Sequence, residues 1–233
     1  MRRIVQMMRV RAISHWTVQR TGIVTKSTSR KKPKMESTYT TMENYDQDLE
    51  QLQTLADELE EYILGDETYR TIMLPRDKGH ERITMSGGQL LSLMNHLLRA
   101  RAQLTAGQQS RLDGITTQVQ QTMAELRTPF HEHLTREAHS HLDRLRWFLD
   151  SCQEDGAQCS NDFPAEIQNR QRLEELSQAF GSAMPDEIAG ALATVDERIR
   201  SLTKDGDFIW PQRSPALYPK ESYWYLYVTP VVE

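Results

Sequence analysis

Hydrophobic residues between positions 43 and 64 recur in alternating steps of four and three, which is the spacing of one face of an amphipathic helix. The members of this stripe are Tyr45, Leu49, Leu52, Ala56, Leu59 and Ile63. Gly65 follows directly, as is typical of a helix C-terminus. We expect this helix to pack into a bundle of its own chain, although three heptads of this kind can also pair two chains as a coiled coil.

The pattern then changes to two short runs of β-prone residues, at positions 69–74 and 81–85. The segment between the runs contains Pro75 and Gly79, which are turn residues. The sequence therefore predicts a small β-hairpin near residues 69–86.

The helical period returns after Ser86, which can act as an N-cap, with Gln89 placed to complete a capping box. The widest apolar arc of the chain follows, so we expect the helix over residues 87–104 to be the central one. Thr105 and Gln108 repeat the capping-box pattern and predict a helix at residues 106–127. The same signals predict further helices at 128–154, 164–180 and 185–204. The helix at 164–180 is mostly polar and is expected to lie outside the bundle core.

The segment from Asp207 onward contains seven of the seventeen aromatic residues of the chain. In its strand-like run 222–228, tyrosines alternate with other apolar residues, so one face can pack on helices and the other can stack against a ligand, peptide or base. The candidate interaction residues of this segment are Trp210, Tyr223, Trp224, Tyr225 and Tyr227. Trp147 is a further candidate, because it points away from the apolar face of its helix, where we expect a later segment to cover it.

Together these elements predict a mainly α protein, an antiparallel bundle of about six helices with a small β-hairpin and an aromatic β-like C-terminal extension. We expect three parts along the chain: a disordered basic leader at 1–35, the helical bundle at 36–206 and the extension at 207–233. The leader could instead be a targeting segment, or translation could begin at Met35 or Met42.

Charge is distributed unevenly along the chain. Residues 1–35 carry ten of the 28 Lys and Arg residues and no acidic residue, which leaves 18 basic against 33 acidic side chains, a formal charge of −15, in residues 36–233. An acidic body repels the phosphates of nucleic acids, so only the basic arm is a candidate for binding them. No apolar run approaches the roughly 18 residues that span a bilayer, and we expect a soluble cytoplasmic protein without membrane partners.

The two cysteines of the chain, Cys152 and Cys159, are expected to be reduced thiols, the first on a helix face and the second in a loop. A secreted disulfide framework normally comes with a signal peptide and more cysteines, and neither is evident here. The spacing of the two cysteines also matches no zinc motif.

Four of the seven histidines lie between residues 131 and 141, on the predicted helix 128–154. A helical wheel separates them, with His141 inside the apolar face, Glu137 one turn earlier at its boundary, and His133 toward solvent. The Glu137–His141 pair can be explained without any cofactor, as a core histidine that forms a hydrogen bond with a neighbouring carboxylate. The alternative is a divalent transition metal bound by this pair, with His96 or His133 completing the site.

We find no nucleophile elbow, phosphate loop, dinucleotide-binding fingerprint or metalloprotease motif. The sequence therefore favours a non-catalytic protein-protein interaction or scaffolding protein. Such a protein would bind another protein, or a second copy of itself, through the helix at 43–64 or the aromatic extension. The first alternative is a metal-dependent helical-bundle enzyme, and the second is nucleic-acid binding through residues 1–35.

Overall fold

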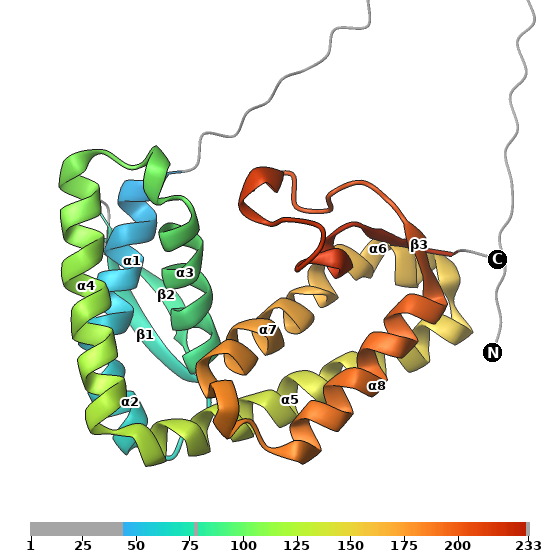
Figure 1. Cartoon of the computed structure of the whole chain (residues 1–233), viewed down its shortest axis with the longest axis horizontal. Helices are drawn as coiled ribbons and strands as arrows, with labels where there is room; N and C mark the ends of the chain where they lie inside the picture. Colours follow the sequence, from blue (N-terminus) through green and yellow to red (C-terminus); the bar gives the residue numbers. More distant parts are fainter. Residues whose placement is uncertain (1–43, 77–78, 232–233) are drawn as a thin grey trace, which may run out of the picture. The chain divides into compact units, whose positions relative to one another are not determined.

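The structure is a computed structural model that describes residues 44–76 and 79–231. The predictions for the basic leader, residues 1–35, lie outside the described residues. Within them the protein is mainly α, with a two-stranded antiparallel hairpin and a short C-terminal strand beside an aromatic cluster, as the sequence predicts (Figure 1). In this part of the chain, no helix combines the length and apolar composition needed to cross a membrane.

The stripe of apolar residues predicted between positions 43 and 64 lies on the first two helices of the described chain. This segment forms α1 (Tyr45–Asp57) and α2 (Leu59–Leu64), which are separated at Glu58. Leu49, Leu52 and Leu59 of the stripe are completely buried within the chain, because α1 packs against α3 (Gly87–Arg99) and α4 (Ala106–Glu125). The stripe is therefore part of an intramolecular core.

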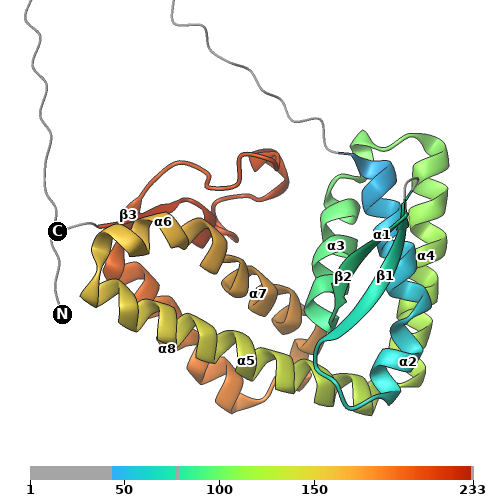
Figure 2. The same ribbon diagram turned by 180° about the vertical axis from the view of Figure 1, so that it is seen from behind.

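The hairpin connects α2 to α3, as predicted. Strand β1 (Arg70–Arg76) pairs antiparallel with β2 (Gly79–Met85), and the register places Ile72 opposite Ile83. Figure 2 shows the two strands lying beside α1 and α3. Leu74 is buried in the hairpin, so one of its faces contributes to the core.

A short 3-10 turn, η1 (Arg101–Gln103), joins α3 to α4, whose first turn has the predicted capping box between Thr105 and Gln108. The long helix α5 (Arg127–Glu154) follows and contacts α6 (Gly156–Glu166), α7 (Gln168–Phe180) and α8 (Asp186–Leu202). A further 3-10 turn, η2 (Gly181–Ala183), lies between α7 and α8.

Helix α7 does not lie outside the core, contrary to the prediction from its polar composition. Its apolar residues Leu173 and Leu176 are buried, and so are the polar side chains of Gln171 and Glu175 on other sides of the helix. Helix α7 is enclosed because it packs against both α3 and α5 (Figures 1 and 2). The helical segment before it also begins earlier than predicted, at Gly156, with Asp155 as its N-cap.

The C-terminal extension returns over the helices. Strand β3 (Thr203–Asp205) pairs antiparallel with β4 (Val228–Pro230), and two 3-10 turns, η3 (Pro215–Leu217) and η4 (Trp224–Leu226), lie between them. The predicted strand at 222–228 is therefore mostly wrong, because η4 turns the chain and sends Tyr225 and Leu226 into the core.

The cysteines form a disulfide, which overturns the prediction of reduced thiols. Cys152 lies in the last turn of α5 and Cys159 in α6, with their Cα atoms 4.7 Å apart. Cys159 is therefore helical and buried, not in a loop. The prediction failed because it judged oxidation from the number of cysteines and the lack of a signal-like segment, whereas the sharp turn between α5 and α6 brings the two sulfur atoms together.

Candidate functional site

Glu137 is the most deeply buried of the predicted metal-site candidates. The sequence places it at the boundary of the apolar face, but its side chain is 0% exposed. Its carboxylate accepts hydrogen bonds from Ser86 Oγ at 2.7 Å and from the backbone N–H of Gly88 at 3.0 Å. A carboxylate at the N-terminus of a helix also interacts favourably with the helix dipole. Glu137 therefore anchors the start of α3 on α5.

The paired glycines allow this contact. A Cβ atom on Gly88 would lie 2.6 Å from a carboxylate oxygen of Glu137, and one on Gly87 would lie 2.6 Å from Leu134. Ser86 caps α3 as predicted, by accepting a hydrogen bond from the backbone N–H of Gln89. Gln89 does not complete the predicted box, because its side-chain oxygen accepts a hydrogen bond from Arg172 instead.

His141 is the candidate that the structure brings close to Glu137. The distance between His141 Nε2 and a carboxylate oxygen of Glu137 is 3.3 Å, and Nδ1 lies 2.9 Å from the amide oxygen of Asn169. The two remaining candidates are elsewhere. His133 is buried rather than solvent-facing, with Nε2 2.9 Å from the carbonyl oxygen of Gly65, while His96 lies on α3. Among residues 44–76 and 79–231, no three metal-ligating side chains come together as a potential metal site.

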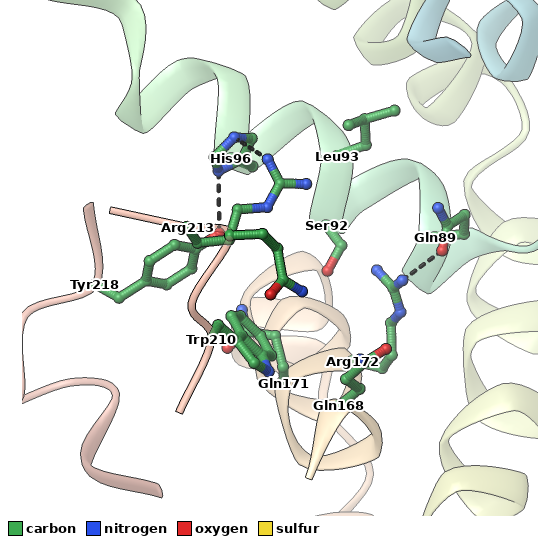
Figure 3. Close-up of a pocket in the computed structure, with 11 residues that line it drawn as sticks. Gln89, Ser92, Leu93, His96, Gln168, Gln171, Arg172, Trp210, Arg213 and Tyr218 are labelled. Carbon is green, nitrogen blue, oxygen red and sulfur yellow. Dashed lines mark hydrogen bonds between the residues drawn. The ribbon is translucent and has the colours of Figure 1, made fainter. Parts of the chain in front are cut away.

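His96 lies in a second polar cluster, where α3 meets the C-terminal extension. It is 2% exposed, and its Nδ1 lies 3.0 Å from Tyr218 Oη. Arg213 donates a hydrogen bond to the other ring nitrogen, Nε2 (Figure 3). Burial, together with the charges of Arg213 and Arg99, lowers the pKa of His96 to about 3. The imidazole is therefore neutral at physiological pH, with its proton on Nδ1, because a guanidinium has no acceptor for a proton on Nε2.

A cavity of about 160 Å³ opens beside His96. Three segments line it: α3, the first turn of α7, and the loop that precedes and follows η3. Figure 3 shows Arg172 and Arg213 on two sides of this space, with Trp210 between the extension and α7. Of the cavity residues, only His96 and Trp210 were predicted as site candidates from the sequence.

Most of the aromatic candidates are used for packing within the chain. Tyr225 is completely buried, donates a hydrogen bond to Gln171 at 2.7 Å, and lies under the guanidinium of Arg170. Tyr223 is also buried, and Arg99 donates a hydrogen bond to its hydroxyl. These contacts attach the extension to α3 and α7.

The other two aromatic candidates of the extension are partly buried. Tyr227 donates hydrogen bonds to backbone carbonyls of the extension itself, at Pro215 and Tyr218. Trp224 lies 3.9 Å from the guanidinium carbon of Arg200, which stacks over the indole ring. Both side chains thus stabilise the conformation of residues 207–231 rather than leaving an open stacking platform.

Trp147 is the exception among the aromatic candidates. No later segment among residues 148–231 covers it, contrary to the prediction, and its side chain is 71% exposed on the outer side of α5. Arg144, three residues earlier, has a 62% exposed side chain and forms a bidentate pair with Glu166. Tyr69, from the segment before β1, is 42% exposed and lies 6.2 Å from the ring of His141. We refer to Tyr69, Arg144 and Trp147 as the outer α5 patch.

Sequence reasoning missed the buried polar residues of α7. Glu175 is completely buried and accepts hydrogen bonds from Asn95, Arg99 and Gln171. Gln171 and Glu175 are one turn apart and on the opposite side of the helix from Leu173, so a helical wheel assigns them to solvent. The pairing of Gln with Glu at i and i+4 beside two arginines, Arg170 and Arg172, was the only available signal.

Comparison of the chain with protein-family models, with curated proteins and with solved structures finds no match.

Proposed function

We propose that this protein is a non-catalytic protein-protein interaction protein that associates with a second copy of itself through the outer α5 patch. The observation that carries the proposal is the 71% exposure of Trp147. A tryptophan exposed to this extent leaves a large apolar surface in water, which association would remove. Trp, Tyr and Arg are also the residue types that dominate binding energy at protein interfaces, and the patch contains one of each.

A symmetric dimer requires a patch that is complementary to itself, so that residue i contacts residue j of the partner and residue j contacts residue i. The outer α5 patch meets this condition, because it contains a π-face at Trp147 and a cation at Arg144 one helical turn away. Two antiparallel copies of α5 would place each indole over the guanidinium of the other copy. The bidentate pair with Glu166 already fixes the plane of that guanidinium.

The predicted interaction surface on the 43–64 segment does not support this proposal, because its apolar stripe is buried inside the chain. The alternative of a metal-dependent enzyme has no observation in its favour, since Glu137 is occupied by donors from Ser86, Gly88 and His141. Self-association through α5 is therefore the function that we favour.

Sedimentation velocity of the full chain, from low to high micromolar concentration, tests the proposal. We expect the average mass to rise toward that of a dimer with concentration, and Trp147→Ala to shift this rise to much higher concentration. Arg144→Gln should weaken association as well, by removing the cation that stacks on the partner's indole. The matched control is Met73→Ser, which removes an exposed apolar side chain on β1, 49% exposed and away from α5.

Two results would contradict the proposal. One is a wild-type protein that remains monomeric at every concentration, which would assign the exposed indole to a different partner. The other is a dimer whose dissociation constant is the same in Trp147→Ala and wild type.

A further inference from the structure

The cavity beside His96 has a chemical character that differs from the acidic composition of the protein. The residues that line it are Gln89, Ser92, Leu93, His96, Gln168, Gln171, Arg172, Trp210, Gln212, Arg213 and Tyr218. This set contains two guanidinium groups and four side-chain amides but no carboxylate. The cavity wall is therefore positively charged and rich in hydrogen-bond donors, in a chain with a formal net charge of −5.

Arg172 provides the first positive charge. Its guanidinium donates hydrogen bonds to the carbonyl oxygen of Gly88 at 3.1 Å and to the side-chain oxygen of Gln89, which are both uncharged acceptors. No carboxylate of the described chain lies within ion-pair distance of it. Burial lowers the pKa of Arg172, and the more distant charges of Glu137 and Glu175 oppose this effect. A partly buried guanidinium without a carboxylate partner is costly, and it has further N–H donors to offer.

Two other donors lie on the opposite side of the same cavity. Arg213 uses one terminal nitrogen for Asp48, at 3.2 Å, and for His96. The indole nitrogen of Trp210 is buried and makes no hydrogen bond within the described chain. The Trp210 ring lines the cavity, and buried polar groups normally have a partner, so a small rotation of the indole when a ligand binds would pair its N–H with an acceptor.

The volume of the cavity limits the size of that acceptor. About 160 Å³ is close to the size of a cavity that admits benzene and holds roughly five water molecules at ~30 Å³ each. A nucleotide or a peptide is too large for this space. An inorganic oxyanion or the carboxylate end of a small organic acid fits it, and guanidinium groups bind both in a bidentate manner.

We propose that the cavity between α3, the start of α7 and the C-terminal extension is a binding site for a small oxyanion, either a phosphate or a small carboxylic acid. Arg172 and the Trp210 indole bind the oxygens, and Arg213 contributes the second positive charge. The neutral His96 holds Arg213 in place and adds no charge of its own. Four of the lining residues belong to the extension, so the ligand also attaches residues 207–231 to the helices.

Isothermal titration calorimetry of the full chain in a buffer without phosphate or carboxylate tests this site. Two probes distinguish the sources of the oxyanion: inorganic phosphate and succinate, with sodium chloride at matched ionic strength as the control. We expect saturable binding of at least one probe and none of chloride. A second readout is the change in tryptophan fluorescence on ligand addition, because Trp210 lies in the cavity wall. If this change disappears in Trp210→Phe, Trp210 is the tryptophan that responds.

Variants then locate the binding. Arg172→Gln should weaken the affinity roughly 10- to 150-fold, the effect of losing hydrogen bonds from a charged donor. Trp210→Phe keeps the aromatic ring and removes the N–H, so we expect a loss of about 2- to 10-fold. The matched control is Lys204→Gln, which removes an exposed positive charge of β3 outside the cavity and should leave the affinity unchanged.

Binding of phosphate alone, of succinate alone or of both supports the site and identifies its oxyanion. Failure of both probes to saturate at millimolar concentration overturns the proposal, as does an unchanged affinity in Arg172→Gln. If Arg172→Gln does not fold, Trp210→Phe decides the question, and an unchanged affinity in that variant has the same consequence. Neither result depends on whether the outer α5 patch forms a dimer.

Discussion

Acidification should destabilise the protein through His96. The ring is buried between Tyr218 and Arg213, and its pKa is lowered to about 3 from an ordinary value of 6.5. The carboxylate of Asp48 lies 3.8 Å from Nε2, but it is paired with Arg213, and burial outweighs its attraction for a proton. As the pH falls below 6.5, the unfolded chain binds a proton at this histidine and the folded chain does not. Stability is therefore lost as the pH decreases from about 6.5 to about 3, where the folded state is protonated as well.

The magnitude follows from the two pKa values. Between pH 7 and pH 5 the unfolded histidine with a pKa of 6.5 becomes almost fully protonated, while the folded one remains neutral. At about 1.4 kcal/mol per pH unit below the unfolded value, His96 should lower the free energy of unfolding by about 2 kcal/mol over this interval. This is a large fraction of the roughly 5–15 kcal/mol that stabilises a folded domain.

Urea unfolding of wild type and His96→Gln at pH 7 and pH 5 measures this contribution. Glutamine is neutral at every pH and can still accept a hydrogen bond from Arg213 and donate one to Tyr218. Burial also lowers the pKa of His131 and His133, but both remain in the variant, so their effects cancel in the comparison. We expect the variant to lose about 2 kcal/mol less than wild type between the two pH values. Equal losses in the two proteins would refute the assignment of His96 as a buried neutral histidine.

Three further predictions concern the contacts that hold the helices together, and thermal or urea unfolding checks each of them. Gly88→Ala should lower the free energy of unfolding by about 1–3 kcal/mol, because its Cβ would collide with the carboxylate of Glu137. Gly114→Ala, in an open position of α4, should instead raise it by about 0.5–1 kcal/mol. Equal effects of the two substitutions would mean that the close approach of Gly88 to Glu137 is unimportant. Glu137→Ala should lower the free energy of unfolding by about 2–5 kcal/mol, because it leaves the buried donors of Ser86 and Gly88 without an acceptor, and Glu137→Gln, which keeps an acceptor, should lower it less. Reduction of the disulfide between Cys152 and Cys159 should lower the free energy of unfolding by about 2–3 kcal/mol, because the unfolded chain gains entropy when the short loop is no longer closed. Two free thiols, found by thiol titration of unfolded, unreduced protein, would contradict the disulfide.

The elements that depend on neighbouring residues could be predicted from the amino-acid sequence. The period of the apolar stripe predicted one helix where the chain forms α1 and α2, separated at Glu58. The capping residue Thr105 predicted the start of α4, and the turn residues predicted the hairpin of β1 and β2. Each of these signals is local, because helix and strand periods, caps and turns act over a few residues. The mainly α class followed from the same signals.

Which polar helix faces are enclosed depends on long-range packing and could not be predicted from the sequence. A helical wheel assigns Glu137 to a boundary and Glu175 to solvent, but both are completely buried, because a second layer of structure covers the polar side of their helices. The reverse holds for Trp147, which is 71% exposed because no segment of the described chain packs over its indole. The burial of a side chain depends on which distant segment packs against it, and periodicity describes only its own helix.

The cavity beside His96 also arises from the packing of distant segments. Its charged residues, Arg172 and Arg213, and the indole of Trp210 come from α7 and the C-terminal extension, while the rest of the wall comes from α3. These segments are far apart in the chain and contain no shared motif. They meet because the aromatic residues of the extension pack on α3 and α7 and bring the cavity residues of the extension with them. The sequence contained the donors, but the packing of three separate segments placed them around one space.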